Sequence, residues 1–563
     1  MPFKPKVIFL ILLLAALYTI HYWWKLGQPI DLVEAPVEKL NCVSYSPFHK
    51  PGQTPLDSQL TISKQQIEAD LNQLSKQFAC VRTYSVSQGL AEVPQIAKQL
   101  DMRVLLGIWI GRNPIDNEKE LAIGAGLARE YPETVSALII GNEVLMRREQ
   151  TPSNMRQYLM EIKTRAPGVA ISYADSWDFW LRYQNELLDV VSFATVHILP
   201  FWDDDTVAVS EAAEYVGNTY RRIQEAFNGK PILIGETGWP SYGRQRQDAA
   251  SSQINQARFI REFSVIAKQQ NIPYNIIEAF DQPWKRHSEG AVGGYWGMFS
   301  EDGTAKFSLK GAVAEAPQWQ AIAIFTSLLL FTLLLINHKV NPLSDLTTTM
   351  ILAIASISGG GASVSYWRDM FMTNRTWLEW SYSGLYALSL IGVIFLSSRY
   401  FVAWFSQNQL PPSVSQPHRL MTLNLTTLRD IDNWQSILRQ LFLLGATIAC
   451  ILLVFDLRNR DYPLALFAVP SLSFAVLAWI KAKHDACLEE IVMAAWIAIA
   501  GLWLPIIEHL IFAPDMSSHF SDGINVNVFY WTAICLILSG SILVPAFFEL
   551  RARQRQKSQN KTQ

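Results

Sequence analysis

Eight short apolar segments recur through the first half of this 563-residue chain, and they constrain its fold more than any other feature. They are spaced roughly 33 residues apart and alternate with helix-like stretches. Buried strands that alternate with helices favour parallel pairing with helical crossovers, and eight such units have the size of a TIM-type (β/α)8 barrel of the α/β class. The predicted strands are 41–45, 79–85, 103–109, 137–143, 169–175, 190–197, 231–236 and 274–280.

Polar residues stand at the ends of several of these predicted strands. In a (β/α)8 barrel the carboxyl ends of the strands and the loops after them form one mouth, where active sites lie. We therefore expect one set of polar side chains to converge there. The set consists of Arg82, Tyr84, Asn142, Glu143, His197, Glu236, Glu278 and Asp281.

Glu143 and Glu236 are 93 residues apart, close to three strand–helix units, so they should face each other across the mouth. Paired carboxylates are what glycoside hydrolysis requires, with one donating a proton and the other attacking or activating water. Their surroundings must then give them different pKa values. A separation of about 5–5.5 Å would indicate retention through a covalent intermediate. The alternative is that both form structural ion pairs at the rim.

The other polar residues at the mouth each allow two interpretations. Arg82 either orients Glu236 and keeps it ionised or pairs elsewhere in the barrel core. His197 is either a substrate contact or a satisfied histidine at a strand end. Glu278 either binds sugar hydroxyls or sets the charge of the site.

Six tryptophans fall at or just beyond the strand ends. Flat indole rings suit the apolar faces of sugar rings, but large aromatic residues also fill barrel rims. The six are Trp109, Trp177, Trp202, Trp239, Trp284 and Trp296. We expect Trp239, Trp284 and Trp296 to contact sugar.

Four motifs carry a resemblance to a known family. The run "ILIGETGWPSYG" resembles the signature of glycoside hydrolase family 17, the β-1,3-glucanase family, and "LIIGNEV" resembles its acid/base strand. "IIEAFDQPWK" and "GGYWGMFSEDGTAKF" resemble the last strand and the loop after it, most like fungal and bacterial members. The resemblance covers about residues 41–316. It implies Glu236 as nucleophile, Glu143 as acid/base, Asn142 as a contact of the sugar 2-hydroxyl and Tyr84 beside the nucleophile.

Long apolar runs outside the barrel predict a membrane domain, which lies outside the usual pattern of that family. The N-terminal run "VIFLILLLAALYTIHYWW" is long enough to span a bilayer, and no small-x-small cleavage site follows it, so we expect an uncleaved signal anchor. About seven further spans are predicted. One of them contains the Ser/Gly-rich stretch "SISGGGASVS" (356–365), which indicates either close helix packing or a polar path. The predicted spans are 318–337, 346–366, 378–398, 436–455, 463–480, 489–512 and 526–548.

The Lys and Arg residues between the spans predict the orientation. With a cytoplasmic N-terminus, the inner segments carry most of the positive charge and the basic tail "ELRARQRQKSQNKTQ", so both termini are inside and the barrel faces outward. The inner residues are Lys4, Lys6, Lys339, Arg399, Arg419, Arg429, Lys481 and Lys483; the outer ones are Arg368, Arg375, Arg458 and Arg460. We expect a bacterial inner-membrane protein with a signal anchor and linker (1–39), a periplasmic catalytic barrel (40–316) and a polytopic membrane domain (317–563).

Cysteine content and charge narrow the remaining possibilities. Cys42 and Cys80 could pair, but their place in neighbouring strand-like runs favours free buried thiols. A net charge of −2 without a basic stripe argues against a nucleic-acid partner. The chain shows no phosphate-binding loop, metal cluster or nucleotide motif, so we expect neither a cofactor nor a metal.

These observations predict a retaining glycoside hydrolase acting on β-1,3-glucan. The main alternative is a β-1,3-glucan transglycosylase that branches or elongates glucan, since the two differ only in whether water or a sugar hydroxyl accepts the glycosyl group. A glucan transporter, or a synthase scaffold with a non-catalytic barrel, is a third interpretation. The expected partners are a β-glucan and the lipid bilayer, with a membrane glucan synthase as a further candidate.

Overall fold

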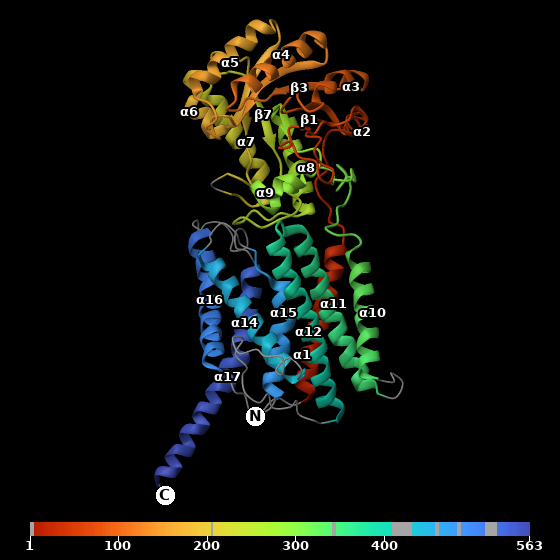
Figure 1. Ribbon diagram of the computed structural model, residues 1–563, viewed down its shortest axis with the longest axis vertical. Coiled ribbons are helices and arrows are strands. Elements are labelled where there is room, and N and C mark those ends of the chain that lie inside the picture. The colour runs from red at the N-terminus through yellow and green to blue at the C-terminus, as the bar shows by residue number, and fades with distance from the viewer. Residues whose placement is uncertain are drawn as a thin grey trace. The chain divides into compact units, whose positions relative to one another are not determined.

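The computed structural model describes residues 5–203, 206–339, 345–407, 431–455, 461–480, 486–512 and 526–562. The chain divides into two compact units (Figure 1). One unit is continuous and comprises Pro29–Val313. The other combines Met1–Gln28 with Ala314–Gln563, so the N-terminal helix belongs to the same unit as the C-terminal helices.

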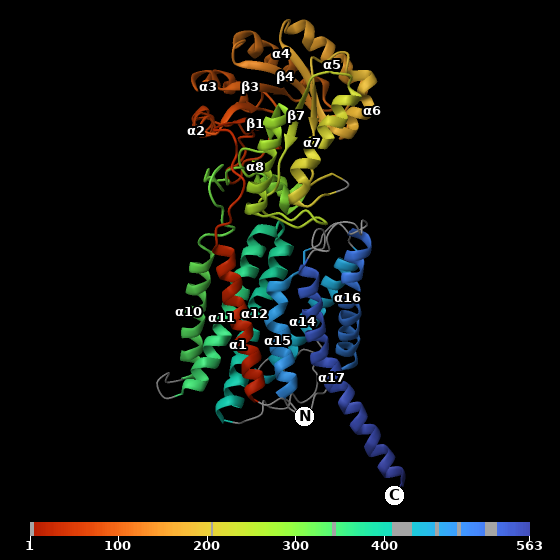
Figure 2. The same ribbon diagram turned by 180° about the vertical axis from the view of Figure 1, so that it is seen from behind.

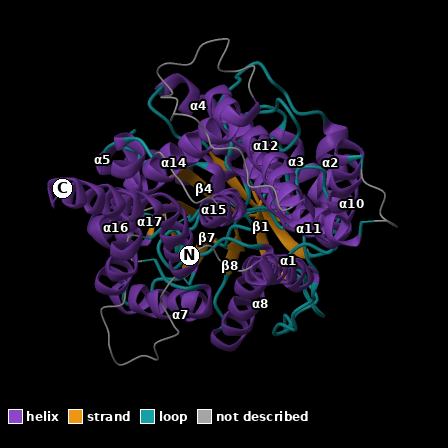
Figure 3. Cartoon of the chain, turned by 90° about the horizontal axis from the view of Figure 1, so that it is seen from below, coloured by secondary structure: helices purple, strands orange, loops and turns teal. Residues whose placement is uncertain are grey.

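The Pro29–Val313 unit is a closed barrel of eight parallel strands that follow one another in chain order. The last strand pairs with the first through Cys42 opposite Asn275, which closes the barrel. This confirms the predicted (β/α)8 fold, and Figure 3 shows the strands in orange. They are β1 (Leu40–Ser44), β2 (Phe78–Arg82), β3 (Arg103–Ile108), β4 (Val135–Asn142), β5 (Ala170–Ser176), β6 (Ala194–His197), β7 (Ile232–Thr237) and β8 (Tyr274–Ile276).

Helices connect the strands, and several of them begin at side-chain caps. Ser63, Thr151 and Ser252 each accept a hydrogen bond from the backbone N–H three residues later, which satisfies a donor that the helix leaves open. Asn113 caps the helix that starts with Pro114. The helices are α2 (Lys64–Leu74), α3 (Val93–Gln99), α4 (Pro114–Glu130), α5 (Pro152–Arg165), α6 (Trp177–Leu187), α7 (Val209–Ala226) and α8 (Gln253–Gln270).

Apolar side chains fill both faces of the barrel wall. The larger cluster lies between strands and helices and includes Val81, Leu106 and Ile234. A smaller cluster contains Cys80, Leu105 and several residues of the other strands, which alternate with those of the larger one. Because side chains alternate across a strand, the smaller cluster fills the interior of the barrel.

Cys42 and Cys80 form a disulfide bond inside the barrel, which overturns the expectation of two free thiols. The two residues are direct partners in the register between β1 and β2, and their Cα atoms are 4.3 Å apart. The sequence places the two cysteines in neighbouring strands but does not give the register between those strands. The register decides whether they can pair, because it brings both side chains to the same level of the barrel.

We expect the disulfide to stabilise the barrel. The closed segment corresponds to a sequence separation of 38 residues, for which chain-entropy arguments give about 2–4 kcal/mol. Thermal unfolding of the full chain in detergent, with and without reductant, measures the effect. Reductant should lower the midpoint of the wild type but leave that of a Cys42→Ala/Cys80→Ala variant unchanged, and equal responses would contradict the expectation.

The second unit is a bundle of helices, in which α1 (Pro5–Gly27) lies beside α10 and α11 (Figures 1 and 2). Among the described residues, seven helices are long and apolar enough to cross a membrane, and α15 is a shorter apolar helix. These eight correspond to the predicted spans. The C-terminal helices are α10 (Trp319–His338), α11 (Leu346–Thr373), α12 (Trp377–Gln407), α14 (Ile431–Phe455), α15 (Leu464–Ile480), α16 (Leu488–Phe512) and α17 (Asn527–Thr562).

Several of the charges on which the predicted orientation depends lie outside the described residues. They are Lys4, Arg419, Arg429, Arg458, Arg460, Lys481 and Lys483. The orientation therefore stays a prediction from the sequence.

The Ser/Gly-rich stretch lies within one unbroken helix, α11. A side chain at Gly359 would collide with Ile394 of α12, one at Gly360 with Ser327 of α10, and one at Gly361 with Trp23 of α1. Three successive glycines thus let three neighbouring helices approach α11 closely. This supports the packing interpretation.

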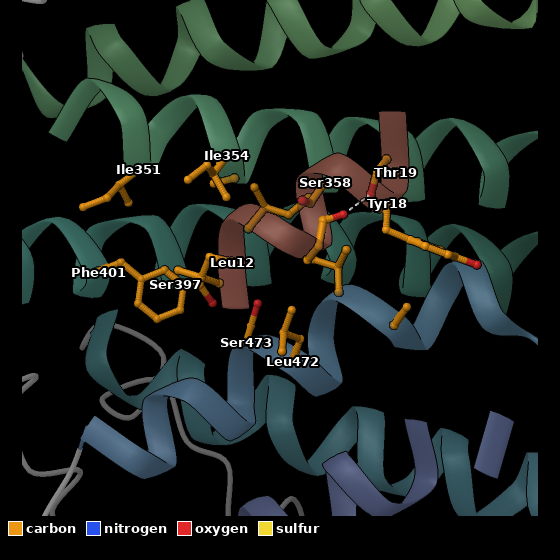
Figure 4. A pocket seen from close by; sticks show the side chains of 15 residues that line it. Leu12, Tyr18, Thr19, Ile351, Ile354, Ser358, Ser397, Phe401, Leu472 and Ser473 are labelled. Carbon is orange, nitrogen blue, oxygen red and sulfur yellow. Dashed lines mark hydrogen bonds between the residues drawn. The ribbon is translucent and has the colours of Figure 1, made fainter. Parts of the chain in front are cut away.

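A cavity of about 200 Å³ lies between α1, α11, α12 and α15 (Figure 4). Its lining is mainly apolar, with hydroxyl groups from Ser358, Ser397 and Ser473 and a threonine, Thr19, that bonds to the carbonyl of Ala15. None of the described residues that line it is charged. Because its lining is mainly apolar, the cavity gives little support to the polar-path interpretation.

Candidate active site

The polar residues at the mouth come together around two glutamates. Asn142 ends β4 and Glu143 follows it, while Glu236 lies near the end of β7. Arg82 ends β2, and His197 ends β6 opposite Glu236 in the register. Neighbouring parallel strands end at the same edge, so residues far apart in sequence share one site.

Glu236 is nearly buried, with 5% of the residue exposed, and two donors hold one of its oxygens. Tyr84 donates to Oε1 at 2.8 Å and Arg82 Nη1 donates to the same atom at 3.2 Å. Burial and the negative charge of Glu236 raise the pKa of Tyr84 well above its ordinary value, so this hydroxyl stays protonated. No described residue donates a hydrogen bond to Oε2, which leaves that oxygen available.

Arg82 is itself fixed by the strands on either side of the mouth. It is 1% exposed, and it donates to the carbonyl of Gly235 at 2.8 Å and to Asn142 Oδ1 at 2.6 Å. The interpretation in which Arg82 orients Glu236 thus has direct contacts behind it. The same contacts fix the amide of Asn142, whose Nδ2 group must point away from the guanidinium.

Glu143 has a different environment, as a pair of unlike carboxyl groups requires. Its side chain is 21% exposed, its Oε1 lies 3.1 Å from His197 Nδ1, and its Oε2 lies 4.0 Å from Arg147 Nη1. Burial raises the pKa of Glu143, but the hydrogen bond and charge of His197, with Arg147 and Arg82, outweigh burial and leave the pKa below its ordinary value.

The two carboxylates lie close together across the mouth. Oxygens of Glu143 and Glu236 and a ring nitrogen of His197 all lie within 4.8 Å of one another. His197 is 1% exposed, and its Nε2 is 3.7 Å from Glu236 Oε1, so it lies between the glutamates. The separation is near the range of about 5–5.5 Å of retaining glycosidases and below the range of about 6.5–9.5 Å of inverting enzymes.

These three side chains have the donor types of a metal site, but their surroundings do not suit one. Glu236 Oε1 already accepts hydrogen bonds from Tyr84 and Arg82. The guanidinium of Arg82 would repel a second positive charge at that oxygen. The arrangement is better matched to a hydrogen-bonded carboxylate pair.

Glu278 and Asp281 form buried ion pairs. Both oxygens of Glu278 accept from Lys285 Nζ, at 2.9 and 2.8 Å, and burial raises the pKa of Glu278 to about 7. Asp281 accepts from Lys306 Nζ at 2.6 Å and from the Gly297 N–H at 3.0 Å. For Glu278 the contacts favour the interpretation in which it sets the charge of the site. For Asp281 both contacts go to Oδ1, and its assignment to substrate binding stays a prediction.

The tryptophans differ from the expectation. Trp239 is fully buried against Phe201 and Phe259, and its Nε1 donates to the carbonyl of Ala250, so it offers no face to a sugar. Trp296 is 3% exposed and stacked on Trp202. The assignment of both to sugar contact is therefore corrected. Each packs behind the mouth.

Four of the six indoles keep some exposure: Trp177, Trp202 and Trp284 are partly exposed, and Trp109 is exposed. Trp284 is partly exposed, and its Nε1 donates to Gln282 at 2.7 Å. Trp109 has 38% of its surface exposed, and the guanidinium of Arg147 lies 4.6 Å from its ring. Arg147 also faces Glu143, so Trp109 lies on the Glu143 side of the pair.

Sequence reasoning missed Asp175, a buried carboxyl group at the end of β5. Its oxygens accept from Tyr173 and from the Ser176 N–H, burial raises its pKa to about 6, and it interacts electrostatically with His197 and Glu143. The signal was present, since Asp175 lies near the end of β5 as Glu236 lies near the end of β7. Arg147 and Lys285 were also missed, because Arg147 lies in a turn and Lys285 in a short 3₁₀ helix, both outside the strand pattern.

A comparison with family models gives the barrel its class: residues 42–297 match the BtgE/BtgC glycoside hydrolase domain. The barrel is a glycoside hydrolase domain of this type. Among curated proteins, a glucan 1,3-beta-glucosidase of Arthroderma benhamiae is 29% identical over 262 residues, covering 43% of this chain and 83% of the relative. A glucan 1,3-beta-glucosidase of Saccharomyces cerevisiae is 22% identical over 266 residues, covering 43% of this chain and 84% of the relative.

Solved structures similar to this glycoside hydrolase domain include an active-site mutant of a Rhizomucor miehei beta-1,3-glucanosyltransferase in complex with laminaritriose. It is 24% identical, with a TM-score of 0.43, and the match covers 48% of this chain and 98% of that one. The family match and the curated relatives together make this an enzyme domain of the glycosidase class. The expected resemblance is confirmed at the level of the domain.

Proposed function

We propose that this protein is a membrane-bound retaining enzyme that cleaves β-1,3-glucan, with Glu236 as nucleophile and Glu143 as acid/base. One observation carries the proposal: two differently held carboxylates face each other within 4.8 Å at the carboxyl ends of β4 and β7. The curated relatives, which are glucan 1,3-beta-glucosidases, support the substrate class.

The contacts of each carboxylate fit one role in a two-step reaction. In the first step Glu143 donates a proton to the leaving oxygen while Glu236 Oε2 attacks the anomeric carbon and forms a glycosyl ester. Tyr84 and Arg82 hold Oε1, which orients the attacking oxygen. In the second step Glu143 takes a proton from the acceptor as the ester breaks.

Two further residues have roles beside the carboxylates. Asn142, with its Oδ1 engaged by Arg82, can donate its amide N–H to the 2-hydroxyl of the cleaved sugar. His197 holds Glu143 by a hydrogen bond and lies beside Glu236, so it positions both. This positioning role does not require His197 to contact the substrate.

Transfer to a sugar hydroxyl is the second candidate function, and Trp109 favours it. Its exposed indole lies on the Glu143 side, where the leaving group departs and an acceptor must enter. An aromatic surface there can stack on an incoming sugar and help it to compete with water. The product would be an elongated or β-1,6-branched glucan. A transporter or scaffold role fits poorly with a fully assembled carboxylate pair.

The location is proposed from the distribution of charge and from the disulfide. Seven long apolar helices in the part of the chain that the structure describes indicate membrane association. The excess of Lys and Arg on one side of the predicted spans supports cytoplasmic termini and a periplasmic barrel at a bacterial inner membrane. A disulfide between Cys42 and Cys80 suits an oxidising compartment. On this basis 1–39 is a signal anchor and linker, 40–316 the catalytic barrel and 317–563 the membrane domain, for which docking onto a glucan synthase is one role.

The experiment incubates the full chain in detergent with a reducing-end-labelled β-1,3-gluco-oligosaccharide and sizes the products by mass spectrometry. Shorter products alone indicate hydrolysis, and products longer than the substrate indicate transfer, with linkage analysis to detect β-1,6 branches. A β-1,4-linked oligosaccharide is the control. Folded protein that leaves the β-1,3-linked substrate intact would overturn the substrate assignment.

The environment of Glu143 gives a prediction for pH dependence. Glu143 must be protonated for the first step, so its pKa sets the alkaline limb of kcat/KM. His197 lowers that pKa; replacing His197 with alanine removes this effect and should move the limb to higher pH. The pH profile of each variant measures the shift. His49→Ala is the matched control, because His49 is also buried but contacts Asp70 and the carbonyl of Glu301; a limb that stays in place in His197→Ala would contradict the assignment.

A further inference from the structure

Glu120 is a buried carboxylate on α4 that takes no part in the chemistry proposed above, yet it joins two loops of the mouth. It is 5% exposed. Its Oε2 accepts from the backbone N–H groups of Val86 and Trp109, both at 3.0 Å. Its Oε1 accepts from the hydroxyl of Ser85 at 2.6 Å and from that of Ser87.

Hydrogen bonds alone compensate the charge of Glu120. The described residues place no basic side chain within ion-pairing distance of it, and four donors from outside its own helix surround its two oxygens. Leaving such donors unpaired in a buried place is costly, so the loops are held where the carboxylate can reach them. Glu120 thereby fixes backbone positions in both loops.

Each loop carries a partner of one catalytic carboxylate. Ser85 directly follows Tyr84, which donates to Glu236. Trp109 follows β3, and Arg147 lies between its ring and Glu143. Through these two loops, Glu120 is connected to the partners of both Glu236 and Glu143.

We propose that Glu120 is a positioning residue that holds Tyr84 and Trp109 in place and so determines how well a sugar binds on the leaving-group side. The inference rests on the proposed function, because it takes Glu143 as the acid/base. Displacing Tyr84 should slow the reaction of every substrate, since each needs the nucleophile. Displacing Trp109 should slow only the reaction of substrates that have a sugar on the leaving-group side.

Three substitutions separate geometry from charge. Glu120→Gln can keep all four contacts, because its carbonyl can accept from the two N–H groups while its amide donates to the serine hydroxyls, which rotate to accept. Glu120→Leu has similar bulk and no acceptor. Glu120→Asp keeps the charge but shortens the side chain, and it serves if the leucine variant does not fold.

The test compares kcat/KM for a β-1,3-gluco-oligosaccharide with that for its dinitrophenyl glycoside, which has no sugar on the leaving-group side. Displacement of catalytic groups by about 1 Å can cost about 100-fold in rate. We expect Glu120→Leu to lower kcat/KM for the oligosaccharide by about 10- to 100-fold. The fold loss in kcat/KM for the dinitrophenyl glycoside should be smaller by a factor of at least about three. Glu120→Asp should show the same unequal loss, and Glu120→Gln should stay close to the wild type.

Glu118→Leu is the matched control, because Glu118 lies on the same helix and pairs with Arg165 at the surface. It should leave both values unchanged. Equal losses on both substrates in Glu120→Leu or Glu120→Asp would reduce Glu120 to a general stabiliser, and a loss in Glu120→Gln as large as in Glu120→Leu would assign the effect to charge. A wild type that cleaves neither substrate overturns the proposed function, whereas an active wild type with an unchanged ratio in the variants overturns only the role of Glu120.

Discussion

Replacing Glu236 with alanine is expected to lower kcat for a β-1,3-gluco-oligosaccharide by at least about 10⁴-fold, because it removes the attacking oxygen from a catalytic group that acts as a unit. Glu236 has one oxygen held by Tyr84 and Arg82 and one available, as a nucleophile requires. Product formation from the labelled oligosaccharide over long incubation measures the loss. The same substitution at Glu225, an exposed residue of α7, is the control.

Azide provides a chemical test of this role. In the cavity left by Glu236→Ala, azide can attack a dinitrophenyl glycoside directly from the face that the carboxylate occupied. The expected product is an α-glycosyl azide, with inverted configuration. Activity within tenfold of the wild type, or a β-glycosyl azide from this variant, would contradict the assignment of Glu236.

Replacing Glu143 with alanine is expected to have a large effect that depends on the leaving group. General acid catalysis contributes about 10²–10⁴-fold, so cleavage of the oligosaccharide should fall by that factor. Release of dinitrophenolate needs no proton, so the first step with the dinitrophenyl glycoside should be nearly unaffected. A rapid-mixing measurement of dinitrophenolate release separates this burst from the slow second step.

Azide should give the opposite stereochemistry in this variant. Without Glu143, azide attacks the glycosyl ester on Glu236 and yields a β-glycosyl azide, with retained configuration. Equal losses on both substrates, with no burst and no azide product, would show that Glu143 is not the acid/base. Glu149→Ala is a useful control, because Glu149 pairs with Arg147 close to the site.

The architecture of the barrel was accessible from the sequence because it depends on periodic features. Strand spacing and apolar content predicted all eight strands. Polar residues at the strand ends predicted which side chains meet at the mouth. The proximity of four side chains was predicted because strand ends in this fold share one edge: Glu143, Glu236, His197 and Arg82. The proximity of these side chains follows from topology, so no knowledge of packing was needed.

Features that depend on register or on loop packing were not accessible. The disulfide required the register of Cys42 against Cys80, which adjacency in sequence does not give. Trp239 follows a strand end as a sugar-binding residue would, but Phe201 and Phe259 from other segments cover its ring. Asp281 looked free until Lys306, 25 residues later, was placed beside it.

The contacts of Glu120 could not be predicted from the sequence either. Glu120 lies within a helix, away from every strand end, and its charge gives no signal in the sequence pattern. Its importance arises from four donors in two other loops, which only the folded chain brings together.

Covalent trapping can show directly whether Glu236 is the nucleophile. The full chain is incubated with a 2-deoxy-2-fluoro β-1,3-gluco-oligosaccharide bearing a dinitrophenyl leaving group, which forms the glycosyl ester readily but slows its breakdown. Intact mass spectrometry followed by peptide mapping locates the adduct. We expect one glycosyl group per chain on the peptide that contains Glu236, and none in Glu236→Ala. An adduct on another residue, or unimpeded turnover of the normal substrate after this treatment, would contradict it.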